Sequence, residues 1–117
     1  MKGLMIMIRK EKLDAVKAVL QKRNASGMTV SKVLGCGRQK TTPDIEGLQF
    51  VPGMEMQRGL LSKLRIDIIV KDEDVEPLID DICEAAYTGK CGDGKIFIYD
   101  VIDAVRIRTK ERGPSAV

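Results

Sequence analysis

The hydrophobic and polar positions of the chain repeat with two different periods, which predict strands and helices in turn. Residues 1–9 hold an unbroken apolar run that is typical of a buried strand. Residues 28–34 and 63–70 alternate with a period of two, and 96–102 are again mainly apolar, so each segment predicts a strand. Residues 10–24 and 72–87 repeat their apolar positions every three to four residues, which predicts two helices.

The order strand, helix, strand, strand, helix, strand predicts an α+β fold of the ferredoxin-like type, in which two helices back one antiparallel sheet. The apolar face of the second helix comprises Val75, Leu78, Ile79, Ile82, Cys83 and Ala86. We therefore expect Cys83 to lie in the core and not to act as a reactive thiol. A length of 117 residues suffices for one domain, 1–117, without disulfide or metal staples.

Residues 38–62 interrupt this pattern with an aperiodic stretch rich in proline and glycine, and a loop of this length is usually functional. A net charge of +3 and an aromatic content of 3% do not favour a nucleic-acid partner. The absence of histidine excludes histidine-based catalysis, and the three cysteines form no C-x-x-C pair. Because no apolar run is long enough to span a membrane, we expect no membrane insertion and a cytoplasmic location.

Residues 88–95 connect the second helix to the last strand and contain three glycines and two lysines. Glycine lets backbone N–H groups approach an anion, so this loop is a candidate phosphate cradle, with an ordinary glycine-rich turn as the alternative. The loop satisfies G-x-x-x-x-G-K, but Ile96 replaces the Ser or Thr that holds magnesium in a Walker A loop. It also follows a helix and precedes a strand, the reverse of a Walker loop. These departures favour nucleotide sensing over hydrolysis.

A second anion-favouring segment follows the last strand. If residues 105–110 are extended, Arg106, Arg108 and Lys110 lie on the same side of the backbone and form a basic comb. Arginine forks suit phosphate or carboxylate groups. The alternative is an edge strand whose solvated charges discourage aggregation.

A third such segment, residues 35–40, enters the long loop. Gln39 offers a carbonyl oxygen to a magnesium ion, and Lys63, where the loop ends, offers an ammonium group to a carboxylate ligand. No pair of carboxylates is placed for general acid–base work, and Asp93 can equally bond its own backbone. These residues indicate a binding protein and not an enzyme.

Taken together, these segments resemble the nitrogen-regulatory PII signalling proteins, and the resemblance covers nearly the whole chain. The matching segments are residues 27–30, 35–40, 88–97 and 106–109. The resemblance implies a homotrimer of ferredoxin-like subunits with a T-loop at 37–63, a B-loop at 88–95 and a C-terminal segment at 103–117. It further implies that ATP and ADP compete for clefts between subunits, and that 2-oxoglutarate binds beside ATP through Mg²⁺.

By position, the resemblance implies a set of ligand contacts. The nucleotide-binding residues would be Thr29, Gly35, Gly37, Arg38, Gln39, Lys90, Gly92, Asp93, Gly94, Lys95, Arg106 and Arg108. Arg106 and Arg108 would reach the phosphates across the subunit boundary. Gln39, Lys40 and Lys63 would bind 2-oxoglutarate, with Gln39 also coordinating the Mg²⁺.

The T-loop departs from the usual family pattern. The tyrosines of the chain, Tyr87 and Tyr99, lie outside it, so we expect no control by uridylylation. Its centre, 48–56, is apolar and suits a protein partner. The candidate partner-binding residues are Phe50, Met54, Met56 and Arg58. Such a loop is similar to that of the nitrogenase-associated branch of the family. Nitrogenase, an ammonium transporter and another enzyme such as glutamine synthetase are alternative targets.

Three other functions compete with a carbon and nitrogen sensor. An adenylate-only sensor with a repurposed T-loop would bind ATP but not 2-oxoglutarate. A small nucleotide phosphohydrolase would need a general base, which the sequence does not offer. If the protein were an adaptor without a ligand, replacing Arg106 and Arg108 would leave its ligand behaviour unchanged.

Overall fold

The computed structural model describes residues 1–25, 27–36 and 61–117. Its main elements are β1 (Lys2–Ile8), α1 (Leu13–Lys22), β2 (Thr29–Gly35), β3 (Leu61–Val70), α2 (Val75–Ala86) and β4 (Gly94–Asp100). Short 3-10 turns at Lys10–Lys12 and Asp72–Asp74 lead into the two helices, and a third covers Gly113–Ala116. The predicted order of strands and helices is confirmed. The carboxylates of the 72–74 turn lie where the N-terminal end of α2 favours negative charge.

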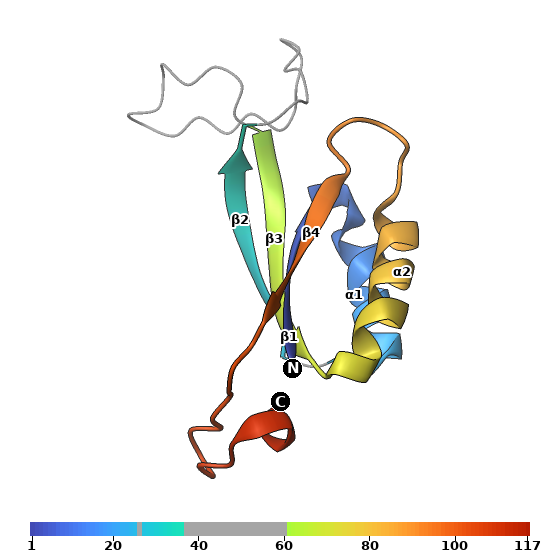
Figure 1. The fold of residues 1–117 in the computed structure, drawn as a ribbon. Helices are drawn as coiled ribbons and strands as arrows, with labels where there is room; N and C mark the ends of the chain where they lie inside the picture. The colour runs from blue at the N-terminus through green and yellow to red at the C-terminus, as the bar shows by residue number, and fades with distance from the viewer. Residues whose placement is uncertain (26, 37–60) are drawn as a thin grey trace, which may run out of the picture.

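The four strands form one antiparallel sheet in the order β2-β3-β1-β4, and both helices lie on the same face of it (Figure 1). At the middle of the sheet, Ile6 of β1 pairs with Ile66 of β3 and Ile96 of β4. This is the ferredoxin-like α+β arrangement that the sequence predicts. In it β2 and β4 are the edge strands.

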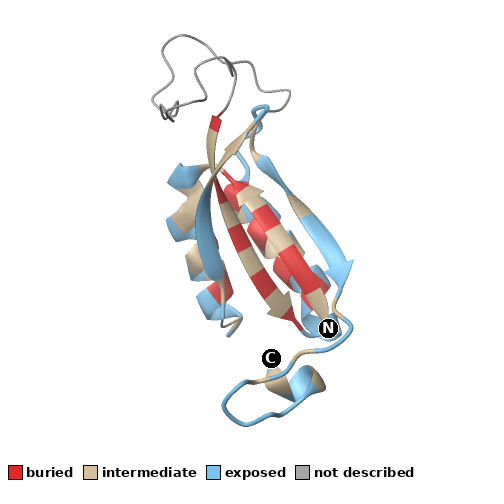
Figure 2. Ribbon diagram, turned by 90° about the vertical axis from the view of Figure 1, so that its left-hand side faces the viewer, coloured by how far each residue is buried: buried red, intermediate tan, exposed pale blue. Residues whose placement is uncertain are grey.

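The core lies between the sheet and the helices. Leu4, Ile6 and Ile8 of β1 are at most 2% exposed, and buried residues alternate with partly exposed ones along β1 and β3 (Figure 2). Met5 and Met7 belong to the opposite face, which no helix covers, so β1 is less fully buried than its apolar run suggests. One face of the sheet is therefore open in the single chain.

The open face carries aromatic side chains on β4. Phe97 is 51% exposed and Tyr99 is 41% exposed. The Tyr99 ring lies over Gly3, its partner in the register, where an added Cβ would be 2.1 Å from a ring carbon. Gly3 thus provides the space that the ring occupies.

The expectation that Cys83 lies in the core is wrong, because Cys83 is exposed. Its neighbours on the same helix face, Leu78 and Ile82, are each 1% exposed. Cys83 borders the groove between α2 and the edge strand β4, where Ile98 is also half exposed. At the margin of an apolar stripe, helical periodicity does not determine whether a neighbouring element covers the side chain.

The expectation of an extended segment at 105–110 is also wrong. Val105 pairs with Arg112, and the backbone N–H of Arg106 donates to the carbonyl of Glu111 over 2.9 Å. Between them the chain turns, with Lys110 at a φ of 61°. The predicted comb is therefore absent. The register between β1 and β4 ends at Lys2 and Asp100, with one further bond from the Val101 N–H to the Met1 carbonyl at 3.2 Å. Hydrogen bonds within residues 104–113 then stabilise a turn.

Candidate functional site

The B-loop, residues 88–95, joins the end of α2 to the start of β4, at the end of the sheet where β2 ends and β3 begins (Figure 1). The helix ends because Tyr87 adopts an extended conformation. Gly89, Gly92 and Gly94 then have φ values of 82°, 102° and 116°, which other residues rarely adopt. At Gly94 an added Cβ would also lie 1.7 Å from the carbonyl oxygen of Met7. The glycines are thus required by the shape of the loop.

Asp93 holds this shape from within. Its carboxylate accepts hydrogen bonds from the backbone N–H of Thr88 at 2.7 Å and of Gly89 at 3.0 Å, and from the Thr88 hydroxyl. The guanidinium of Arg9 donates to the same carboxylate through Nε at 3.1 Å. The hydrogen bonds from Thr88, followed by those from Arg9 and Gly89, hold the pKa of Asp93 far below its usual range. Within this structure Asp93 shapes the loop and remains ionised.

Arg9 is a residue of the site that the sequence analysis does not identify. It follows β1, and besides its bond to Asp93 its Nη2 donates to the carbonyl of Cys91 at 2.8 Å. The side chains of Arg9 and Asp93 are 19% and 24% exposed. Arg9 and Asp93 are 84 positions apart in sequence, so no local pattern could have indicated this contact.

Lys63 links the B-loop to the start of β3. Its ammonium group donates a hydrogen bond to the carbonyl of Gly92. Partial burial and then the charge of Arg9 lower the pKa of Lys63. The structure thus brings the residue predicted to bind 2-oxoglutarate into contact with the loop predicted to bind the nucleotide. Lys63 therefore places a second cation beside the Arg9–Asp93 ion pair.

The described nucleotide-binding candidates fall into two groups that lie apart from each other within one chain. One group gathers at the end of the sheet that carries the B-loop: Gly35, Lys90, Gly92, Asp93, Gly94 and Lys95. The other group is Thr29, Arg106 and Arg108. Thr29 lies on the opposite edge strand, in register with Asp67 of β3. Arg106 and Arg108 follow β4, whose length of about 20 Å, at roughly 3.3 Å per residue, separates them from the B-loop (Figure 1).

Several predicted residues lie outside the described part of the chain. They are Gly37, Arg38, Gln39, Lys40, Phe50, Met54, Met56 and Arg58. The expected magnesium ligand and the expected partner-binding surface therefore stay predictions. Within residues 1–25, 27–36 and 61–117, no group of three or more His, Cys, Asp and Glu residues could hold a metal ion.

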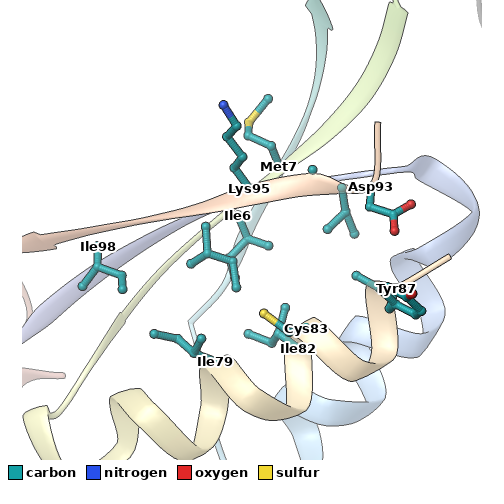
Figure 3. A pocket seen from close by; sticks show the side chains of 13 residues that line it. Ile6, Met7, Ile79, Ile82, Cys83, Tyr87, Asp93, Lys95 and Ile98 are labelled. Carbon is teal, nitrogen blue, oxygen red and sulfur yellow. The ribbon is translucent and has the colours of Figure 1, made fainter. Parts of the chain in front are cut away.

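A pocket of about 360 Å³ adjoins the B-loop on the helical side of the sheet. Ile79, Ile82 and Cys83 of α2 and Ile6 and Ile98 of the sheet line it, so it is mainly apolar (Figure 3). The Lys95 and Met7 side chains point away from α2 (Figure 3). Asp93, which Arg9 binds, lies at the end of the pocket nearest the B-loop. No helix in the described ranges is long and apolar enough to cross a membrane.

The family match and the similar proteins found by comparison all carry the same description. The sequence matches the family described as "Nitrogen regulatory protein P-II" over residues 1–111. It is 44% identical to nitrogen regulatory protein P-II 2 of Methanothermobacter thermautotrophicus, covering 100% of this chain and 97% of that protein. It is 42% identical to nitrogen regulatory protein P-II of Pasteurella multocida and 40% identical to nitrogen regulatory protein P-II 1 of Escherichia coli K12, covering all of each chain.

Proposed function

This chain belongs to the nitrogen regulatory protein P-II family, and from this premise we propose a homotrimeric sensor of ATP, ADP and 2-oxoglutarate that controls a nitrogen-metabolism target by direct binding. Proteins of this family are regulatory signal transducers and not enzymes. The chain is accordingly a regulatory protein of nitrogen metabolism. Its effectors, assembly and target are the proposed part.

The observation that carries the proposal is the division of the nucleotide-binding candidates between the two ends of β4. A ligand that contacts both the B-loop and Arg106 needs a second copy of the chain, because one chain holds these elements at opposite ends of β4, a strand about 20 Å long. The open sheet face and the C-terminal segment expose apolar side chains suited to such an interface: Phe97 at 51%, Ile102 at 99% and Ile107 at 94%. A cyclic trimer would place one copy's C-terminal segment beside its neighbour's B-loop.

The donor set at the B-loop fits a phosphate-bearing ligand. Arg9, Lys63 and Lys95 lie at or beside the loop, and three glycines have backbone conformations that let the chain approach an anion closely. Lys63 would exchange its bond to the Gly92 carbonyl for an effector carboxylate, which is the stronger acceptor because it is charged. Mg²⁺ would be held by Gln39 together with ATP and 2-oxoglutarate.

Calorimetric titration of 2-oxoglutarate into the purified protein tests this function. We expect binding in the presence of Mg-ATP, weaker or absent binding with ADP, and loss of binding in Lys63→Ala. The matched control is Lys32→Ala on β2, because Lys32 pairs with Leu64 in the register and is exposed. ATP binding without 2-oxoglutarate binding would instead establish an adenylate-only sensor. No binding of either ligand would disprove effector sensing.

The proposed target is a protein that contacts the T-loop, with an ammonium transporter, nitrogenase and glutamine synthetase as the alternatives. The absence of tyrosine between residues 37 and 63 supports regulation by effectors alone, without uridylylation. Purified candidates can be tested by pull-down with the protein in Mg-ATP plus 2-oxoglutarate and in ADP. A target should bind in one effector state and be released in the other. Equal binding in both effector states would contradict a regulatory contact.

A further inference from the structure

The C-terminal segment, residues 103–117, is held in shape by its own charged groups. The carboxylate of Asp103 accepts hydrogen bonds from the backbone N–H groups of Ala104 at 2.8 Å and Gly113 at 3.0 Å, and from Nε of Arg112 at 2.8 Å. These contacts close the base of a hairpin-like turn around the Val105 and Arg112 bridge. Contacts between residues of the segment itself therefore define its conformation.

Within this turn the Arg106 guanidinium is already engaged. It forms an ion pair with the carboxylate of Glu111 through Nη1, and Nη2 donates to the carbonyl of Ser115 at 3.1 Å. Ser115 belongs to the short 3-10 turn Gly113–Ala116. The same side chain thus fixes the position of Glu111 and the end of the chain.

The contact is accessible to a competing anion. The side chains of Arg106 and Glu111 are 39% and 47% exposed, so solvent and ligand can reach both. Carboxylate and phosphate oxygens bind a guanidinium in the same forked geometry. A nucleotide phosphate close to Arg106 would also repel Glu111, because like charges at short range destabilise each other.

We propose that Glu111 is an internal stand-in for phosphate, which holds Arg106 while no nucleotide is bound and is displaced when one binds. This inference rests on the proposed function, because it requires Arg106 to contact the nucleotide of a neighbouring copy. A phosphate bound by both Nη1 and Nη2 also replaces the bond from Arg106 to Ser115, so nucleotide binding loosens the Gly113–Ala116 turn. Glu111 therefore lowers the affinity for the nucleotide by competing for Arg106. Binding of the nucleotide in turn changes the conformation of the Gly113–Ala116 turn.

Two measurements on the full-length protein test the inference: ATP affinity by calorimetry, and amide hydrogen exchange of residues 113–117 with and without ATP. We expect Glu111→Gln to bind ATP about two- to fivefold more tightly, since an exposed ion pair changes an equilibrium by a factor of about five or less. Without ATP, Glu111→Gln should exchange faster than the unchanged protein at 113–117. Adding ATP should accelerate exchange there in the unchanged protein.

The control variant is Asp100→Asn, which removes the same charge from the exposed pair with Lys2 and does not contact Arg106. It should leave both the affinity and the exchange at 113–117 unchanged. Equal tightening in both variants would overturn the inference in favour of a general charge effect. If the unchanged protein binds ATP but Glu111→Gln shows neither tighter binding nor faster exchange, the inference alone fails. If the unchanged protein does not bind ATP, the proposed function fails as well.

Discussion

At the scale of single residues, Asp93 and Gly94 determine the shape of the candidate site. The sequence identifies both as parts of a candidate anion-binding loop and leaves two roles open for Asp93, a ligand contact or a bond to its own backbone. The structure assigns the Asp93 carboxylate to donors of the loop and of Arg9. Two predictions follow from this arrangement.

The first prediction concerns the charge of Asp93. The pKa of this carboxyl is lowered in the folded protein, so its ionised form stabilises the fold. We expect Asp93→Asn to lower the melting temperature at pH 7. The difference between the two proteins should be fully present above the unfolded pKa of about 3.9 and should shrink as the pH falls towards the folded value. Thermal denaturation monitored by circular dichroism at several pH values measures it.

Asp80→Asn is the matched control, because Asp80 is exposed on α2 and the change removes the same charge. It should not reproduce the pH-dependent difference. A melting difference for Asp93→Asn that stays constant from pH 7 to pH 3 would contradict a role for the ionised carboxylate.

The second prediction concerns Gly94. Its φ of 116° and the Met7 carbonyl 1.7 Å from an added Cβ leave no place for a side chain. We expect Gly94→Ala to lower the free energy of unfolding by about 3 kcal/mol, the sum of backbone strain and a clash with the main chain. Gly27 also has a positive φ, 81°, but an added Cβ would meet no atom within 4 Å, so Gly27→Ala should cost only about 1 kcal/mol. Equal urea midpoints for the two variants would refute the steric part of this account.

At the scale of elements, the apolar periodicity of α2 predicts the core but not its margin. Leu78 and Ile82 are buried as predicted, whereas Cys83 borders the pocket beside β4. All three side chains belong to the same apolar stripe of α2. Which part of the stripe is covered depends on how far the sheet extends over it, and α2 lies beside an edge strand.

The third prediction follows from this difference. We expect Cys83→Ser to change the free energy of unfolding by less than about 0.5 kcal/mol, because the thiol is exposed and loses little packing. Ile82→Ala, one position earlier and 1% exposed, should cost about 3 kcal/mol through the cavity that it leaves. Urea denaturation measures both. A cost above about 2 kcal/mol for Cys83→Ser would show that Cys83 is part of the core after all.

At the scale of the whole molecule, the proposed site needs two copies of the chain. The B-loop and the C-terminal segment lie at opposite ends of β4, and the isoleucines at 102 and 107 are almost fully exposed. Covering an apolar side chain that the single chain leaves in water lowers the free energy of the assembly. The assembly would therefore bury these residues and complete the ligand site together.

The fourth prediction tests this shared site by complementation. Lys95→Gln and Arg106→Gln should each weaken ATP binding, because each removes a cation from every site. When the two variants are unfolded together and refolded as mixed assemblies, about a quarter of the sites should contain both native residues, since the two cations come from different copies. Calorimetry would then detect recovered high-affinity binding. No recovery in verified mixed assemblies would indicate that one copy supplies both cations.

The sequence alone determines much of this protein because its main patterns are local. Alternation and helical periodicity fix the element order and most of the core, and the glycines of 88–95 mark a loop that can approach an anion. Contacts between distant positions required the tertiary structure: Arg9 with Asp93, Lys63 with Gly92, and the uncovered edge beside Cys83. Residues 105–112 form a turn although the period-two spacing of their basic residues predicts an extended segment, because hydrogen bonds within the segment satisfy its backbone groups. Periodicity predicts which face of an element is apolar, whereas the packing of the elements determines which residues that face contacts.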